Sequence, residues 1–172
     1  AGFAFWGSLQ FNKVVSLIFR DSLHNLKIGR TDVYLTNPPA WILTVQQTTD
    51  YLKNCLEKDE AFFALPYDAL YYFLTGKKSP VRELQIFKDV YITKEQEIQM
   101  ISQLEKKKIR YIVVSSRIRS KEAEFGIFGV THCMLLAQYI LDQFEVVQVF
   151  GDWSRDPGWY EFHGTKIFKR KK

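Results

Sequence analysis

The chain has 172 residues, of which 47% are hydrophobic and 16% aromatic, so it can build a sizeable core and is not a disordered segment. Its net charge of +5 is spread out, and the short basic runs at 106–108 and 169–172 are typical of solvated surface, which excludes a nucleic-acid partner. Cys55 and Cys133 stand among apolar residues without zinc-ligand spacing, so we expect no metal site.

Residues 1–29 are rich in Phe and Trp but are interrupted by charged side chains. No apolar run in this segment approaches the roughly 20 residues that span a bilayer, and the pattern of a signal peptide is absent. Leu9, Val14, Leu17 and Ile18 share one helical face, which predicts a helix. Two interpretations stay open: a helix packed on the domain, which these residues favour, or an interfacial helix just outside a membrane.

From Arg30 onward, helical and strand patterns alternate along the chain. Four stretches have the apolar spacing of helices: 36–58, 68–76, 93–108 and 128–144. Prolines precede the first helix, Gly76 closes the second, and Thr93 to Gln96 form a capping box for the third. Five stretches read as strands: 60–65, 81–87, 110–116, 145–151 and, as a strand pair or a bent strand, 159–170.

This alternation predicts an α/β fold with a three-layer, Rossmann-like and mostly parallel sheet. We expect its central strands to include 62–65, 111–114 and 146–150, since the unbroken apolar middle of the second suits a strand covered on both faces. The predicted organisation is a helical segment over residues 1–29, followed by one α/β domain over residues 30–172.

Polar side chains follow the predicted strands at Tyr67, Asp68, Arg117 and Asp152. Ligands of open α/β sheets bind at the carboxyl ends of strands, so these residues are candidate ligand-binding residues. A simpler interpretation, which the residues favour, is that Asp68 caps the short helix and that the arginine faces solvent. The chain contains no phosphate-binding glycine motif, no nucleophile elbow and no paired histidine motif, so we assign no catalytic residue, metal or cofactor.

Several motifs carry a family resemblance. They are Arg30 with Val-Tyr-Leu at 33–35, the corner Pro-Tyr-Asp…Tyr-Phe-Leu-Thr-Gly at 66–76 with Pro80 after it, and the runs YIVVSS and FEVVQVFGDW. With these motifs, most of residues 30–170 resembles the soluble C-terminal region of bacterial multi-spanning glycosyltransferases. That family is the dolichyl-phosphate-mannose–protein mannosyltransferase-like superfamily, whose members use polyprenyl-phosphate sugar donors.

The resemblance implies a division of labour within a longer polypeptide. The donor site and the catalytic carboxylate would lie in the membrane-embedded part, and this chain would be a non-catalytic accessory domain on the extracytoplasmic side of the bacterial cell membrane. Its partners would be the membrane-spanning part of the same polypeptide, a polyprenyl-phosphate sugar or acceptor, and the membrane surface through residues 1–29. The alternative is a free-standing α/β domain that binds a ligand, or acts as an enzyme, in the crevice at the strand ends.

Overall fold

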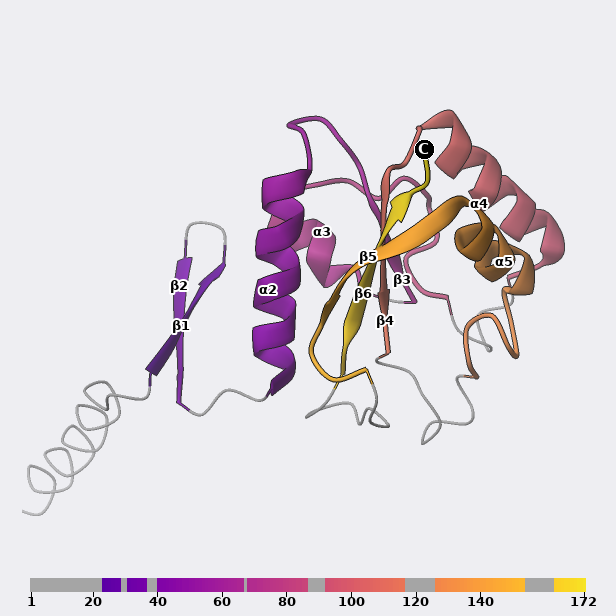
Figure 1. The fold of residues 1–172 in the computed structure, drawn as a ribbon. Helices are drawn as coiled ribbons and strands as arrows, with labels where there is room; N and C mark the ends of the chain where they lie inside the picture. The colour runs from indigo at the N-terminus through magenta and orange to yellow at the C-terminus, as the bar shows by residue number, and fades with distance from the viewer. Residues whose placement is uncertain are drawn as a thin grey trace, which may run out of the picture. The chain divides into compact units, whose positions relative to one another are not determined.

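The computed structural model describes residues 23–28, 31–36, 40–66, 68–86, 92–116, 126–153 and 163–172 (Figure 1). Contacts divide the chain into two compact units, residues 1–38 and 39–172. The boundary predicted from the sequence lies closer to the N-terminus, between residues 29 and 30.

The described part of the first unit is an antiparallel pair of strands, β1 (Leu23–Ile28) and β2 (Thr31–Thr36). The helical prediction for residues 1–29 is therefore wrong over 23–28, while residues 1–22 lie outside the described part. Only Gly29 and Arg30 separate the two strands in sequence, which is the spacing of a two-residue hairpin connection. The helix predicted from the spacing after Leu9 therefore does not continue through residues 23–28.

The second unit contains a four-stranded sheet with the order β3-β4-β6-β5. Its strands are β3 (Phe63–Leu65), β4 (Tyr111–Ser115), β5 (Phe144–Phe150) and β6 (Thr165–Arg170). β3 and β4 are parallel, whereas β6 runs antiparallel to both β4 and β5. The α/β class is confirmed, but the prediction of a mostly parallel sheet is wrong.

The antiparallel pairing of β5 with β6 has a reason in the sequence. Residues 151–164 between them contain Gly151, Pro157, Gly158 and Gly164, a composition that suits a returning loop rather than a crossover helix. The chain therefore re-enters the sheet between β4 and β5. As a consequence β4 and β6 are the central strands of the described sheet, and of the three strands predicted to be central only β4 is.

One predicted strand is absent. Residues 81–86 have no regular secondary structure, and residue 87 lies outside the described part. Ile86 is fully buried, yet its N–H donates to the carbonyl of Pro66 at 2.7 Å instead of joining the sheet. The apolar side chains of this stretch therefore fill the core from a loop, which sequence spacing does not distinguish from a short strand.

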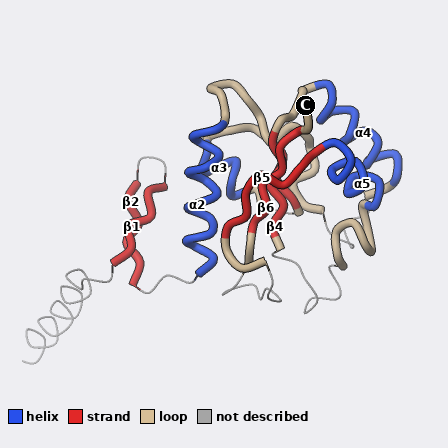
Figure 2. The backbone as a smooth tube through the Cα atoms, in the orientation of Figure 1, coloured by secondary structure: helices blue, strands red, loops and turns tan. Residues whose placement is uncertain are grey.

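Two helices lie on each side of the sheet (Figures 1 and 2). They are α2 (Ala40–Cys55) and α3 (Leu70–Thr75) on one side and α4 (Lys94–Lys106) and α5 (Met134–Gln143) on the other. The capping box at the start of α4 is confirmed, because Gln96 N–H donates to the Thr93 hydroxyl at 3.3 Å and Thr93 N–H donates to the Gln96 side chain at 2.8 Å. None of the helices in the described residues is long and apolar enough to cross a membrane.

The helix α5 begins later than the predicted start at residue 128. Gly129 donates its N–H to the carbonyl of His132 at 2.8 Å, and both Gly126 and Gly129 have positive φ angles. Residues 126–133 therefore form a turn that leads into the helix. A buried carboxylate from α4 caps the new start, since Glu97 Oε2 accepts the N–H of Leu136 at 2.8 Å.

The main core lies between the sheet and the α4–α5 side. It consists of side chains that are all less than a tenth exposed: Phe63, Leu65, Val81, Ile86, Met100, Leu104, Ile109, Ile112, Cys133, Leu136, Ile140, Phe144 and Phe168. On the other side, the buried face of α2 combines threonines with Val45 and Leu52, and the hydroxyls of Thr48 and Thr165 lie 2.5 Å apart. Gly151 allows this close approach, because a Cβ there would lie 2.3 Å from Thr44 Oγ1.

The aromatic corner after β3 is largely a packing feature. Tyr71, Tyr72 and Leu74 are buried, and Gly76 ends α3 in the left-handed conformation with a φ of 69°. Phe73, in contrast, is 75% exposed and does not pack on the sheet. In a helix of one and a half turns only one face meets the sheet, and Phe73 lies on the other.

Candidate binding site at the carboxyl end of the sheet

Three strands end, and one begins, at the same end of the sheet. Leu65 pairs with Val114, while Ser115 and Phe150 both pair with Thr165. The residues that follow β3, β4 and β5, together with those that precede β6, therefore gather at one end. This is the position at which open α/β sheets bind ligands.

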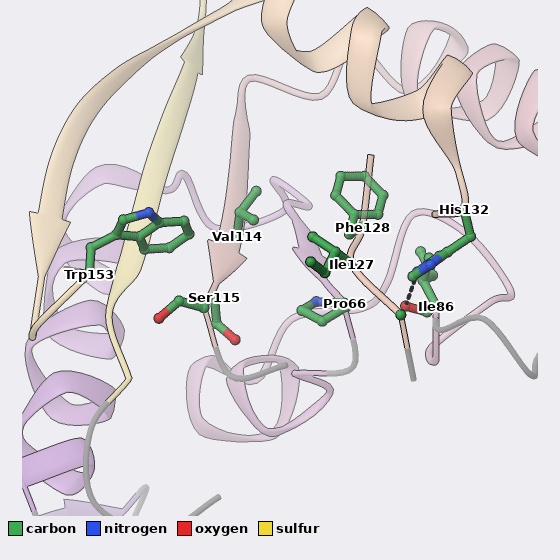
Figure 3. A pocket seen from close by; sticks show the side chains of 10 residues that line it. Pro66, Ile86, Val114, Ser115, Ile127, Phe128, His132 and Trp153 are labelled. Carbon is green, nitrogen blue, oxygen red and sulfur yellow. Dashed lines mark hydrogen bonds between the residues drawn. The ribbon is translucent and has the colours of Figure 1, made fainter. Parts of the chain in front are cut away.

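A cavity of about 100 Å³ lies at this end. Figure 3 shows its walls, with Val114 on the strand, Trp153 on one side, and Phe128 and His132 on the other. The lining residues come from the ends of β3 and β4, from the turn before α5 and from the segment after β5: Pro66, Ile86, Val114, Ser115, Ser116, Gly126, Ile127, Phe128, His132 and Trp153. The described lining is mostly apolar and contains neither a carboxylate nor a Lys or Arg side chain.

The polar atoms of Ser116 are hydrogen-bonded to the residue that precedes β6, not left open to the cavity. Its backbone N–H donates to the carbonyl of Gly164 at 2.9 Å, and its Oγ accepts the N–H of Gly164 at the same distance. The hydroxyl also lies 3.3 Å from the Gly164 carbonyl, to which it donates. This reciprocal pairing extends the β4–β6 ladder by one residue and satisfies the polar atoms of the cavity floor.

His132 is held by a hydrogen bond at each ring nitrogen. Its Nε2 lies 3.3 Å from the carbonyl of Ile86, and its Nδ1 lies 3.1 Å from the hydroxyl of Thr131. A carbonyl only accepts, so Nε2 carries the proton and Nδ1 accepts from Thr131 in the neutral ring. Burial lowers the pKa of His132, although the Ile86 carbonyl and the charge of Glu97 act in the opposite direction. The His132 side chain is thus a neutral, hydrogen-bonded part of the cavity wall.

Lys166 and Gly164 both lie against Trp153. The Nζ atom of Lys166 on β6 lies 4.2 Å from the centroid of its ring, a cation–π contact. Its backbone passes so close to Gly164 that a Cβ at that glycine would lie 2.9 Å from the Trp153 nitrogen. The indole ring is therefore a fixed wall of the cavity.

The predicted site residues are only partly brought together. Asp68 and Asp152 follow strands that end at this end of the sheet, but neither lines the described part of the cavity. Tyr67 and Arg117 lie outside the described residues. Asp68 is buried, and its backbone carbonyl accepts the N–H of Tyr71 at 3.1 Å. Ala69, at the start of α3, makes no side-chain cap, and the interpretation of Asp68 as the cap of this helix stays a prediction.

Sequence reasoning missed the two side chains that frame the cavity. Trp153 directly follows the predicted candidate Asp152, and an aromatic residue just after a strand is a usable signal for a wall at the strand ends. His132 was read as part of a helix, whereas it precedes α5 and faces the crevice. Within the described residues, no three side chains of the His, Cys, Asp and Glu types lie close enough together to hold a metal ion.

Comparisons with known proteins leave the functional question to the site itself. No protein-family model matches the chain, and no curated protein or solved structure shows significant similarity to it.

Proposed function

We propose that this chain is the non-catalytic, extracytoplasmic C-terminal domain of a bacterial integral-membrane glycosyltransferase that uses polyprenyl-phosphate sugar donors. In this proposal it positions the acceptor or stabilises the membrane-embedded part of the same polypeptide. Residues 1–29 lie at the membrane surface, next to the last membrane helix. The helices on both sides of the sheet support the three-layer arrangement that we propose for such a domain.

The observation that carries the proposal is the architecture of the corner at residues 66–76, where the family resemblance is most specific. The hydroxyl of Tyr72 accepts the N–H of Ala64 in β3 at 2.9 Å, Tyr71 is fully buried, and Gly76 adopts the left-handed conformation that ends α3. The motif therefore has a structural role, since it satisfies a backbone donor of the edge strand β3, and this suits a non-catalytic domain. Its residues support a shared fold with the family rather than a catalytic role.

The chemistry of the cavity also favours a role other than sugar transfer. A polyprenyl-phosphate sugar needs cationic groups or a metal at its phosphate and a carboxylate at the acceptor, all held in position. The described lining offers apolar side chains and a neutral histidine instead. Its volume of about 100 Å³ is also below the range of roughly 300–1,000 Å³ in which small-molecule sites usually fall.

The coding sequence upstream of Ala1 tests this proposal. Repeated spans of about 20 apolar residues upstream would support it, and a start codon immediately before Ala1 would refute it. Reporter proteins fused after Lys172 of the full polypeptide then show on which side of the membrane the domain lies. A periplasmic phosphatase should be active there and a cytoplasmic fluorescent reporter dark, while the opposite pair of results would place the domain on the cytoplasmic side.

A second candidate is a free-standing α/β ligand-binding or enzymatic domain that uses the crevice at the strand ends. The favouring observation is the cavity itself, since it lies where this fold class binds ligands and its walls are fixed by hydrogen bonds. The two candidates differ in the gene, because a free-standing domain has its own start codon near Ala1.

A further inference from the structure

We propose that the cavity at the carboxyl end of the sheet is a binding site for one small, uncharged apolar group, about the size of a single six-membered ring. The proposal rests on the volume, the polarity and the rigidity of the cavity walls. It holds for either function proposed above, because it concerns only the described residues of this chain.

The volume sets the size of the ligand. The cavity measures about 100 Å³, and apolar cavities of roughly 150 Å³ are known to stay dry and to take up benzene. A phenyl ring or an isobutyl group is therefore near the upper limit that the cavity accepts without rearrangement. A sugar phosphate or a nucleotide exceeds this limit several-fold.

The polarity sets the chemical class. Ile86, Val114, Ile127 and Phe128 supply apolar surface, and Trp153 adds the face of an indole ring. The hydroxyl of Ser116 and both ring nitrogens of His132 already have protein partners. A charged ligand would lose its hydration without gaining an opposite charge from the described lining, so the site selects against it.

The walls are preformed rather than assembled by a ligand. His132 is bound at both nitrogens, Trp153 rests on Lys166, and Ser116 is paired with Gly164. The carbonyl of Pro66 accepts the N–H of Ile86, which holds these two lining residues together. Because ordering these side chains costs nothing at the moment of binding, even a ring with few atoms can bind measurably.

The test uses toluene and benzoate, which share a phenyl ring and differ in charge. Methyl resonances of Ile86 and Val114 are followed by NMR during titration of the 172-residue chain. Ile127→Phe narrows the cavity from its loop wall, and Val114→Phe narrows it from the strand. Val130→Phe adds the same side chain to the same loop at a position that is 66% exposed and outside the lining, so it is the matched control.

Toluene should shift the methyl resonances saturably, with a dissociation constant of about 1 mM, in the natural chain and in Val130→Phe. The affinity should fall at least ~10-fold in each narrowing variant that keeps the natural chemical-shift dispersion, and benzoate should cause no saturable shift. The apolar ring could belong to a small free molecule or to a side chain of a protein partner. An uncharged peptide analogue, N-acetyl-phenylalaninamide, distinguishes these two sources. Shifts with the analogue indicate a partner's side chain, and shifts with toluene alone indicate a free ring.

Three results would overturn the proposal. They are the absence of any saturable shift with toluene, equal binding of benzoate, and toluene binding that persists unchanged in both narrowing variants. If Val114→Phe does not fold, Ile127→Phe still decides, because that side chain lies in a loop and is already 37% exposed.

Discussion

The hydroxyl oxygen of Tyr72 lies 2.9 Å from the backbone nitrogen of Ala64 and accepts its N–H. Ala64 belongs to β3, an edge strand of the described sheet, so this bond satisfies a donor that no strand among the described residues reaches. The Tyr72 ring also packs on Phe62, with centroids 4.9 Å apart. Burial raises the pKa of Tyr72, which keeps the hydroxyl neutral at physiological pH.

Replacing Tyr72 with Phe should therefore destabilise the fold although the ring is kept. The Ala64 N–H would be buried without an acceptor, which costs about 1–3 kcal/mol, and Tyr72→Ala should cost about 3–5 kcal/mol. Chemical unfolding at equilibrium measures both values. The matched control is Phe73→Ala in the same helix, which should change stability by no more than about 0.5 kcal/mol because Phe73 is 75% exposed. Equal losses for Tyr72→Phe and Phe73→Ala would contradict the structural role assigned to the hydroxyl.

Local signals in the sequence predicted local elements well. The prolines before α2, the capping box of α4 and Gly76 at the end of α3 are signals that act within a few residues, and each marks an element that the structure contains. Strand order depends instead on which distant strands meet. The glycines and proline after β5 suit a chain that turns back, but they do not show that β6 enters between β4 and β5, so the mostly parallel sheet was predicted incorrectly.

The sequence pointed to the end of the sheet at which the cavity lies, but not to the residues that line it. A cavity does lie at the carboxyl end of the sheet, where β3, β4 and β5 end at Leu65, Ser115 and Phe150. The choice of Asp68 and Asp152 came from a preference for charged side chains, whereas the described cavity is lined by apolar side chains and by His132. Which side chain after a strand turns inward depends on tertiary packing, which sequence spacing does not encode.

Gly151 and Gly76 provide a matched test of close packing. Both have a φ of 69°, so a Gly→Ala substitution carries the same backbone penalty of about 1–2 kcal/mol at each position. Around Gly76 a new Cβ meets no atom within 4 Å, whereas at Gly151 it would lie 2.5 Å from the carbonyl oxygen of His163 and closer still to Thr44. Gly151→Ala should therefore lower the midpoint of thermal unfolding well beyond Gly76→Ala. Equal shifts would show that α2 and the segment after β5 do not pack this tightly.

The lowered pKa of His132 predicts a pH dependence of stability. The folded state binds this proton less readily than the unfolded state, whose imidazole has its ordinary pKa of about 6.5. The contribution of His132 is therefore complete above pH 6.5 and is lost as the pH falls from there towards the folded-state pKa. Urea unfolding at pH 7.5 and pH 5.5 measures the difference. His132→Gln should reduce it, and an unchanged difference in this variant would refute the assignment.

The two cysteines should differ in reactivity. Both are free thiols, but Cys133 is 3% exposed, and burial together with the charge of Glu97 raises its pKa to about 12. Cys55 is half-buried near the end of α2. Under native conditions iodoacetamide should modify Cys55 and leave Cys133 intact, and both should react in urea. Peptide mass spectrometry separates the sites, and faster native labelling of Cys133 would contradict its place in the core.

The most direct test of the proposed function is a transfer assay with the purified chain. The chain is incubated with polyprenyl-phosphate sugars and with peptide or lipid acceptors, alone and together with the membrane-embedded part of the same polypeptide. We expect no product from the chain alone and product once the membrane-embedded part is present, because the proposed function assigns the donor site and the catalytic carboxylate to that part. Turnover by the chain alone that disappears in Asp68→Asn would contradict this account and make the strand-end crevice an active site.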